Sequence, residues 1–250
     1  MNGDFLALLP KPPPPVALGP GSPPVPVSAT TVFAFHYAGG VIMAGDHRAT
    51  AGNVVFSDRT EKILELDHHS LMAIAGSPGT AIEMARTLQT TFEFYRRSQL
   101  QPMSLPAKMR ALSRLLRENI PATLQGFGLV APIFVGLDAV TGRPSIYFYD
   151  PLGAEFEAAA YAGSGSGSGS IKSVLHFLEK WGVPKPGEMT LAQGVALANR
   201  LLMTAAEFDT ATGGVDPAQN DFATIKILNS RGVRSISVAE QAAFWREATP

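Results

Sequence analysis

The sequence predicts an α+β protein in which blocks of strands alternate with pairs of helices. Apolar runs of strand length follow residue 29, two amphipathic helices come next, and the same order repeats before two final strands. With 250 residues, 46% of them apolar, the chain can bury a sizeable core as one domain, or as one domain and a tail. We therefore expect one domain over residues 30–250, behind a separate N-terminal segment.

The first two strands are expected to form a hairpin. An apolar run opens at Thr30, Ala38-Gly39-Gly40 supplies a tight turn, and a second apolar run ends at Asp46. A carboxylate at the end of a buried strand must find partners or lose solvation energy, and the nearest cations are Arg48 and Lys62. The hairpin therefore brings threonine, a carboxylate and a lysine together.

This combination of side chains suits a threonine nucleophile. A threonine hydroxyl is weak until a base removes its proton, and the threonine's own α-amine can do so once the preceding chain is cut away. An α-amine has an ordinary pKa of about 8, so it is a base near neutral pH. A lysine ammonium that is held by a carboxylate lowers the pKa of both the amine and the hydroxyl.

The remaining elements follow from apolar periodicity and turn residues. Strands are expected at residues 63–66, 71–75, 129–137, 145–149, 158–162, 223–228 and 233–238. Helices are expected at residues 80–98, 106–119, 171–181 and 190–208, with a short one after residue 239.

Residues 163–170 alternate glycine and serine between a predicted strand and a predicted helix. Such a repeat can be a flexible connection, or it can be an ordered turn between the two elements. A phosphate-binding glycine loop is rejected, because serine occupies the third glycine position of that motif.

Residues 1–29 contain nine prolines and no amphipathic period, so this segment is expected to be extended and solvated, outside the core. Its short apolar run lacks a basic flank and makes a weak signal peptide. The net charge of −1 argues against broad electrostatic binding to nucleic acid or to an anionic membrane. The absence of cysteine excludes disulfides, thiolate metal sites and cysteine catalysis, and is compatible with a reducing cytosol.

The hairpin segment resembles the start of a proteasome β-subunit of the actinobacterial type, which is an N-terminal-nucleophile hydrolase. The shared motifs are Thr30-Thr31-Val32, Gly39-Gly40-Val41, Ala44-Gly45-Asp46, Arg48-Ala49-Thr50-Ala51-Gly52-Asn53 and Lys62. The resemblance extends to about Val238 and implies a four-layer αββα sandwich, with two sheets face to face and helices outside.

The resemblance also implies roles for individual residues. Thr30 corresponds to the mature N-terminal nucleophile, Lys62 to the catalytic lysine and Asp46 to the carboxylate behind it. The N–H of Gly76 corresponds to the oxyanion donor. Residues 1–29 become a propeptide that is removed between Ala29 and Thr30; the family usually has glycine before the threonine, and alanine is also small.

Further support for the nucleophile is implied in the C-terminal half. The glycine-serine run corresponds to a GSGS element whose serine hydrogen-bonds the amine of the threonine; the repeat leaves Ser166 and Ser164 as alternatives, and counting back from the helix favours Ser166. Asp209 and Thr212 match the Asp-x-x-Ser/Thr-Gly-Gly motif that supports the nucleophile.

The residues that correspond to the substrate-binding wall are uncharged, so we expect a preference for apolar P1 side chains. They are Ala49, Thr50, Leu64, Ile74 and Pro78.

The implied assembly is a barrel of stacked heptameric β-rings capped by rings of α-subunits. Unfolded proteins would enter through the α-ring from a regulatory ATPase and be cut inside a closed chamber in the cytoplasm. This chemistry requires no metal or organic cofactor.

Two alternatives stay open. An HslV-type peptidase shares the threonine, aspartate and lysine motifs but forms hexameric rings; the long C-terminal half and the glycine-serine element favour the proteasome instead. The second alternative is a catalytically silent structural ring subunit. Retention of Thr30, Asp46 and Lys62 counts against that alternative.

Overall fold

The structure, a computed structural model, describes residues 30–51, 54–138 and 140–248. The expected propeptide, with Ala29 at its end, lies outside these residues. Strands and helices follow the predicted order of blocks. They are β1 (Thr31–Tyr37), β2 (Gly40–Gly45), β3 (Ala49–Ala51), β4 (Val54–Ser57), β5 (Ile63–Asp67), β6 (Ser70–Ala73), α1 (Pro78–Gln99), α2 (Leu105–Glu118), α3 (Ile120–Leu124), β7 (Ile133–Leu137), β8 (Pro144–Tyr149), β9 (Glu155–Ala158), β10 (Tyr161–Gly165), α4 (Ser168–Trp181), α5 (Leu191–Phe208), β11 (Thr224–Asn229), β12 (Gly232–Ser235) and α6 (Val238–Ala248).

Two five-stranded antiparallel sheets form the centre of the described part of the chain. The first has the order β10-β1-β2-β11-β12, so the strand that begins at Thr31 lies inside the sheet, between β10 and β2. The second has the order β5-β6-β7-β8-β9 and is built from strands that are neighbours in sequence. The predicted hairpin is confirmed as β1 and β2, joined at Ala38-Gly39-Gly40.

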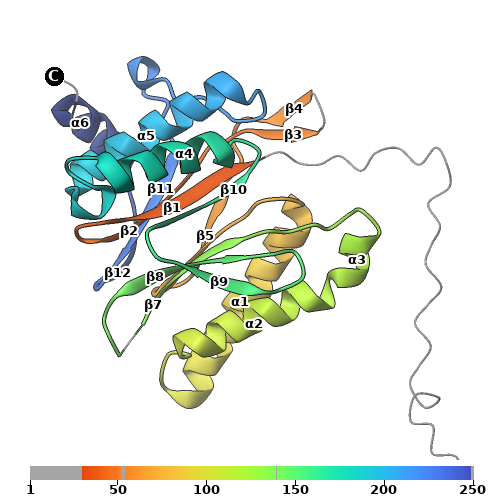
Figure 1. The fold of residues 1–250 in the computed structure, drawn as a ribbon. Helices are drawn as coiled ribbons and strands as arrows, with labels where there is room; N and C mark the ends of the chain where they lie inside the picture. Colours follow the sequence, from red (N-terminus) through yellow and green to blue (C-terminus); the bar gives the residue numbers. More distant parts are fainter. Residues whose placement is uncertain (1–29, 52–53, 139, 249–250) are drawn as a thin grey trace, which may run out of the picture.

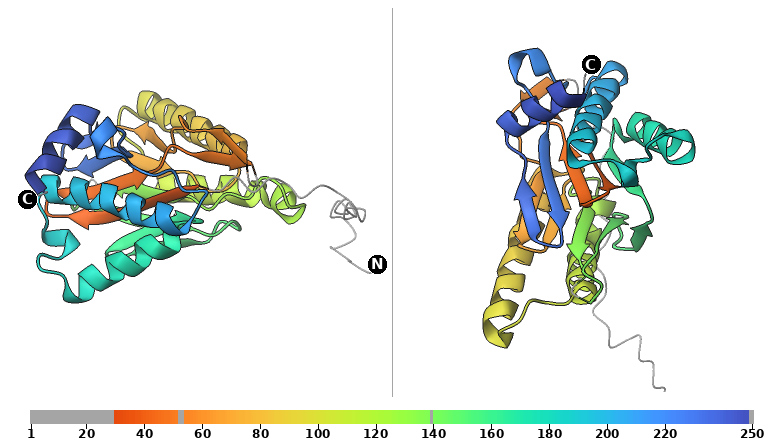
Figure 2. Two further views of the ribbon diagram at one scale, coloured as in Figure 1. Left: turned by 90° about the horizontal axis from the view of Figure 1, so that it is seen from above. Right: turned by 90° about the vertical axis from the view of Figure 1, so that its left-hand side faces the viewer.

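Three apolar clusters fill the spaces between four layers. Alternate residues of β1 face opposite sides, as the period of a strand requires. Val32 and Ala34 pack between the two sheets, whereas Phe33 and Phe35 pack against α4 and α5. A third cluster lies between the second sheet and helices α1 and α2. Figures 1 and 2 show these helix pairs on the outer faces of the two sheets, so the four-layer α+β sandwich is confirmed.

One predicted strand proves to be two. Residues 158–162 were expected as a single strand, but β9 pairs with β8 in the second sheet, whereas β10 pairs with β1 in the first. The chain crosses from one sheet to the other at Ala159–Ala160. Its alanines and flanking apolar residues suit either sheet, so local composition does not indicate the crossing.

Other boundaries also differ from the prediction. The β3–β4 hairpin and α3 were not expected, and both are short. Helix α4 begins at Ser168 instead of residue 171. The glycine-serine run is therefore the end of β10, a turn and the first turn of α4, and its interpretation as a flexible connection is wrong.

Among the described residues, every helix is too short or too polar to span a membrane.

Candidate active site

Asp46 follows β2 directly and is 2% exposed. Its Oδ1 accepts hydrogen bonds from Lys62 Nζ at 2.6 Å and from the Thr31 N–H at 3.1 Å. Its Oδ2 accepts from the N–H groups of Gly213 at 2.8 Å and Arg48 at 3.0 Å. Four donors therefore compensate this buried carboxylate for the loss of water.

Lys62 precedes β5 and is 1% exposed. Besides the contact to Asp46, its Nζ donates to the carbonyl oxygen of Arg48. Burial lowers the pKa of Lys62, although the charge and the hydrogen bond of Asp46 act in the opposite direction. The guanidinium of Arg48, which sequence placed as the other candidate partner of Asp46, pairs with Asp58 at 2.9 Å instead.

A second polar cluster comes from the C-terminal half of the chain. Asp209 ends α5, and its Oδ2 accepts hydrogen bonds from Thr212 Oγ1 and from Ser166 Oγ, both at 2.6 Å. Ser164, the alternative serine, instead donates to the carbonyl oxygen of Ala131 at 2.8 Å. The structure thus brings Ser166, Asp209 and Thr212 together and leaves Ser164 out.

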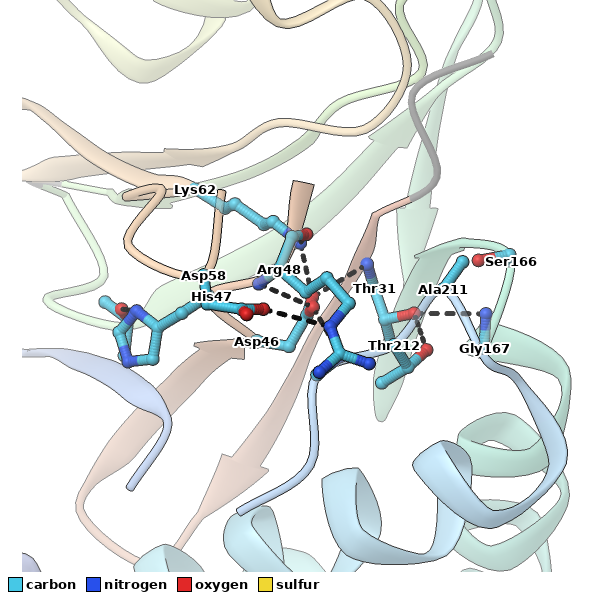
Figure 3. A network of polar contacts seen from close by, with 12 residues as sticks. Thr31, Asp46, His47, Arg48, Asp58, Lys62, Ser166, Gly167, Ala211 and Thr212 are labelled. Carbon is cyan, nitrogen blue, oxygen red and sulfur yellow. Dashed lines mark hydrogen bonds and ion pairs between the residues drawn. The ribbon is translucent and has the colours of Figure 1, made fainter. Parts of the chain in front are cut away.

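Thr31 joins the two clusters, and sequence reasoning gave it no role of its own. Its N–H contacts Asp46, while its Oγ1 lies 2.6 Å from Thr212 Oγ1 and accepts from the Gly167 N–H at 3.0 Å (Figure 3). The side chain is completely buried. The sequence does contain a signal for Thr31. It is the second threonine of the Thr-Thr pair and begins the first strand of a hairpin whose second strand ends just before the buried Asp46.

Thr30 immediately precedes β1 and is 5% exposed. Its carbonyl oxygen accepts a hydrogen bond from the Ser166 N–H at 3.0 Å. Gly165 closes against the same oxygen: a Cβ there would lie 1.6 Å from it, and the φ of Gly165 is +95°. The backbone of Thr30 is thus fixed against the turn between β10 and α4, next to both polar clusters.

Gly76 lies between β6 of the second sheet and α1. It forms an isolated bridge with Val130, through hydrogen bonds from Ser77 to Leu129 and from Ala131 to Ala75. Within the described residues, these bonds leave the Gly76 N–H without an intramolecular acceptor. A φ of +104° and a would-be Cβ 2.1 Å from the Leu129 carbonyl oxygen both require glycine here.

The expected substrate-binding residues come from four neighbouring segments. Ala49 and Thr50 lie on β3, Leu64 on β5, Ile74 after β6, and Pro78 begins α1. Leu64 and Ile74 pack in the same apolar cluster. The Thr50 hydroxyl is buried without a hydrogen-bond partner among the described residues, so it retains an unused donor and acceptor.

No group of three or more histidine, cysteine, aspartate or glutamate side chains is placed to hold a metal ion in the part of the chain that the structure describes.

Comparison with known proteins shows the family to which this chain belongs. The family model described as "Proteasome subunit" matches residues 27–216. "Proteasome subunit beta 2" of Thermomonospora curvata is 36% identical over 89% of this chain and 78% of the relative. "Proteasome subunit beta" of Acidimicrobium ferrooxidans is 34% identical over 84% and 74%.

A third relative, "Proteasome subunit beta" of Acidothermus cellulolyticus, is 34% identical over 92% of this chain and 80% of its own length. The family match spans most of the chain, and these relatives are β subunits of bacterial proteasomes. The resemblance noted from the hairpin motifs is thereby confirmed: this chain belongs to the proteasome subunit family, as a β-type subunit of the actinobacterial kind.

Proposed function

We propose that this chain is a threonine endopeptidase subunit of the proteasome core and that Thr30 is its nucleophile after residues 1–29 have been removed. One observation carries the proposal. The buried Asp46–Lys62 pair and the Ser166–Asp209–Thr212 cluster meet at the residue next to Thr30, through the backbone and side chain of Thr31.

Each group would have a defined part in peptide hydrolysis. The Thr30 Oγ attacks the peptide carbonyl carbon, and its proton passes to the free α-amine of Thr30, directly or through a water molecule. That proton then moves to the leaving amine as the C–N bond breaks, which leaves an acyl ester on Thr30. Water, deprotonated by the same amine, hydrolyses the ester and releases the second product.

The Asp46–Lys62 pair would set the electrostatics of this proton transfer. A buried ammonium beside the hydroxyl and the amine favours their deprotonated forms. Asp46, held by four donors, keeps the ammonium in place. Ser166, Asp209 and Thr212 support the position of the amine.

The Gly76 N–H is our candidate for the oxyanion donor, because no intramolecular acceptor among the described residues engages it. Removal of one such donor typically costs about 10²–10³ in rate. The uncharged side chains of Ala49, Leu64, Ile74 and Pro78 support a substrate wall that prefers apolar P1 residues. The buried Thr50 hydroxyl, which has no partner among the described residues, is instead suited to a polar group of the substrate.

For assembly, we propose stacked heptameric β-rings capped by α-subunit rings, with a regulatory ATPase that delivers unfolded proteins in the cytoplasm. This part of the proposal rests on family membership.

The experiment that tests the function is the intact mass and N-terminal sequence of the chain, co-expressed with its α-type partner. We expect the wild type to begin at Thr30 and to hydrolyse peptides, and the Thr30→Ala variant to keep residues 1–29 and to be inactive. Thr91→Ala, an exposed threonine on α1, is the matched control and should behave as wild type. If the wild type keeps residues 1–29 in assembled rings, the α-amine base cannot exist, and a structural subunit becomes the better interpretation.

A further inference from the structure

We propose that Thr31 is a positioning residue whose hydroxyl orders a one-way chain of hydrogen bonds that ends at Asp209. This inference rests on the proposed function, because the effect of Thr31 would be exerted on its neighbour, the nucleophile Thr30. Its basis is the set of contacts around the Thr31 side chain, to which the steps of peptide hydrolysis above assign no role.

The direction of each hydrogen bond follows from the number of available protons. Asp209 Oδ2 lies 2.6 Å from Thr212 Oγ1 and 2.6 Å from Ser166 Oγ. An ionised carboxylate only accepts, so both hydroxyls donate to it. Thr212 has then used its single hydroxyl proton.

The 2.6 Å contact between Thr31 Oγ1 and Thr212 Oγ1 must consequently use the proton of Thr31. The Gly167 N–H in turn donates to Thr31 Oγ1 at 3.0 Å. The chain therefore runs from Gly167 through Thr31 and Thr212 to Asp209, and each hydroxyl donates once. Bonds that point the same way polarise one another, and they are strengthened in a buried site.

Several charged or polar groups face Asp209 from the elements packed around it. Ser166 faces it from the turn before α4, Thr212 and the Ala211 N–H from the segment after α5, and Lys62 from the segment before β5. Arg48 donates to the neighbouring Thr210 carbonyl at 3.3 Å. Burial raises the pKa of Asp209, but the hydrogen bonds from Ser166, Thr212 and Ala211 and the charge of Lys62 outweigh burial and hold the pKa below its ordinary value.

The backbone of Thr31 ties this chain to the other cluster. Its N–H donates to Asp46 Oδ1, the same oxygen that accepts from Lys62. The space around the side chain is also fully used: a Cβ at Gly167 would lie 2.4 Å from Thr212 Oγ1 and 2.7 Å from Thr31 Oγ1. Because Thr31 is held through both its backbone N–H and its hydroxyl, the position of the preceding residue, Thr30, is also restricted.

Because the Thr31 side chain is fully buried, it cannot touch a peptide substrate in this arrangement. Its loss should therefore lower kcat and leave KM unchanged.

Two pairs of variants isolate the hydroxyl, and all are full-length chains co-expressed with the α-type partner. Wild type and Thr31→Val differ by a hydroxyl at nearly constant shape, and Thr31→Ser and Thr31→Ala differ by a hydroxyl without crowding the site. We expect kcat to fall about 10-fold in the Val and Ala variants and the Ser variant to recover it, because the Gly167 N–H is otherwise left buried and unpaired. Thr91→Val, on the exposed face of α1, is the control for the chemical change.

Processing gives a second readout. If Thr31→Val keeps residues 1–29 while Thr31→Ser begins at Thr30, the hydroxyl also positions Thr30 for its own release, which supports the proposal. If Thr31→Val does not assemble, the smaller Ser and Ala pair decides. The proposal is overturned if the Ser variant is as slow as the Ala variant, or if KM rises in step with the fall in kcat.

Two outcomes distinguish the role of Thr31 from the proposed function. An active wild type together with an equally active Thr31→Val overturns the role of Thr31 alone. A wild type that is as inactive as Thr30→Ala overturns the proposed function, and the role of Thr31 with it.

Discussion

The Nζ of Lys62 lies 2.6 Å from Oδ1 of Asp46, and these side chains are 1% and 0% exposed. A buried ion pair is tolerated only where further hydrogen bonds satisfy both partners. Here the backbone supplies them: Thr31, Arg48 and Gly213 donate to the carboxylate, and the Arg48 carbonyl accepts from the ammonium. The pair thus depends on three chain segments that meet only in the folded protein.

Replacement of Asp46 by asparagine should be costly. Asn offers one acceptor oxygen where Asp46 receives four donors, and Lys62 would stay buried without its counter-charge. We expect the free energy of unfolding to fall by about 3–5 kcal/mol and peptidase activity to be lost. Urea unfolding and peptide turnover measure the two effects.

The control for this change is Glu118→Gln, which removes one charge from an exposed pair with Arg114. Exposed pairs contribute about 0–1 kcal/mol, so this variant should stay close to wild type. If the two substitutions lowered the free energy of unfolding equally, Asp46 would contribute no more to stability than an exposed carboxylate.

Sequence predicted much of this arrangement because its signals are local. The apolar run that ends in Asp46 predicted both the hairpin and the burial of a carboxylate, and Lys62 proved to be its partner. The order of the elements also followed from periodicity, since α1, α2 and α5 have long apolar faces that pack against the sheets.

What sequence could not predict depends on contacts between distant segments. Thr31 meets Thr212 across 181 positions, and nothing near either residue indicates the pairing. The choice between Ser164 and Ser166 is likewise made by the partners that the fold presents, Ala131 to one and Asp209 to the other. Residues 155–157 of β9 are exposed and polar or aromatic, so they lack the apolar run by which a strand is recognised.

The two serines of the glycine-serine run should respond differently to removal of the hydroxyl. Ser166→Ala takes a donor from Asp209 and should lower kcat by about 10-fold. Ser164→Ala removes a bond to the Ala131 carbonyl, outside the polar cluster, and should leave kcat near wild type. Steady-state peptide hydrolysis by processed particles measures both; a larger loss in Ser164→Ala would reverse the assignment.

A second buried lysine forms an ion pair from which the loss of stability in acid can be predicted. Lys108 of α2 lies 2.6 Å from Asp67 Oδ2 at the end of β5. Burial raises the pKa of Asp67, but the charge and hydrogen bond of Lys108, with the hydroxyl of Ser70 and the N–H of His69, outweigh it and leave the pKa lowered. A carboxyl of this kind stabilises the fold at pH values above its unfolded pKa of about 3.9 and loses that contribution as the pH falls through the folded pKa.

Asp67→Asn should accordingly be less stable than wild type at pH 7 and should lose less stability between pH 5 and pH 2. Urea unfolding at a series of pH values measures the slope of the unfolding free energy against pH. The exposed Glu83→Gln serves as the control and should keep the wild-type slope. If the unfolding free energy of Asp67→Asn depends on pH as in wild type, this carboxyl is not responsible for the loss of stability in acid.

Two glycines of the same run test whether the turn before α4 holds the nucleophile in place. At Gly165, φ is +95° and an added Cβ would lie 1.6 Å from the carbonyl oxygen of Thr30, so alanine must displace either β10 or Thr30 itself. At Gly169, in the first turn of α4, no atom lies within 4 Å of an added Cβ. Gly165→Ala should therefore lower the thermal midpoint and leave residues 1–29 attached.

Gly169→Ala is the matched control. It should be processed as wild type, and its free energy of unfolding should rise by roughly 0.5–1 kcal/mol, because alanine favours the helix. Intact mass and thermal unfolding of the two variants give the answer: normal processing of Gly165→Ala would mean that Thr30 reaches its reactive position without this turn.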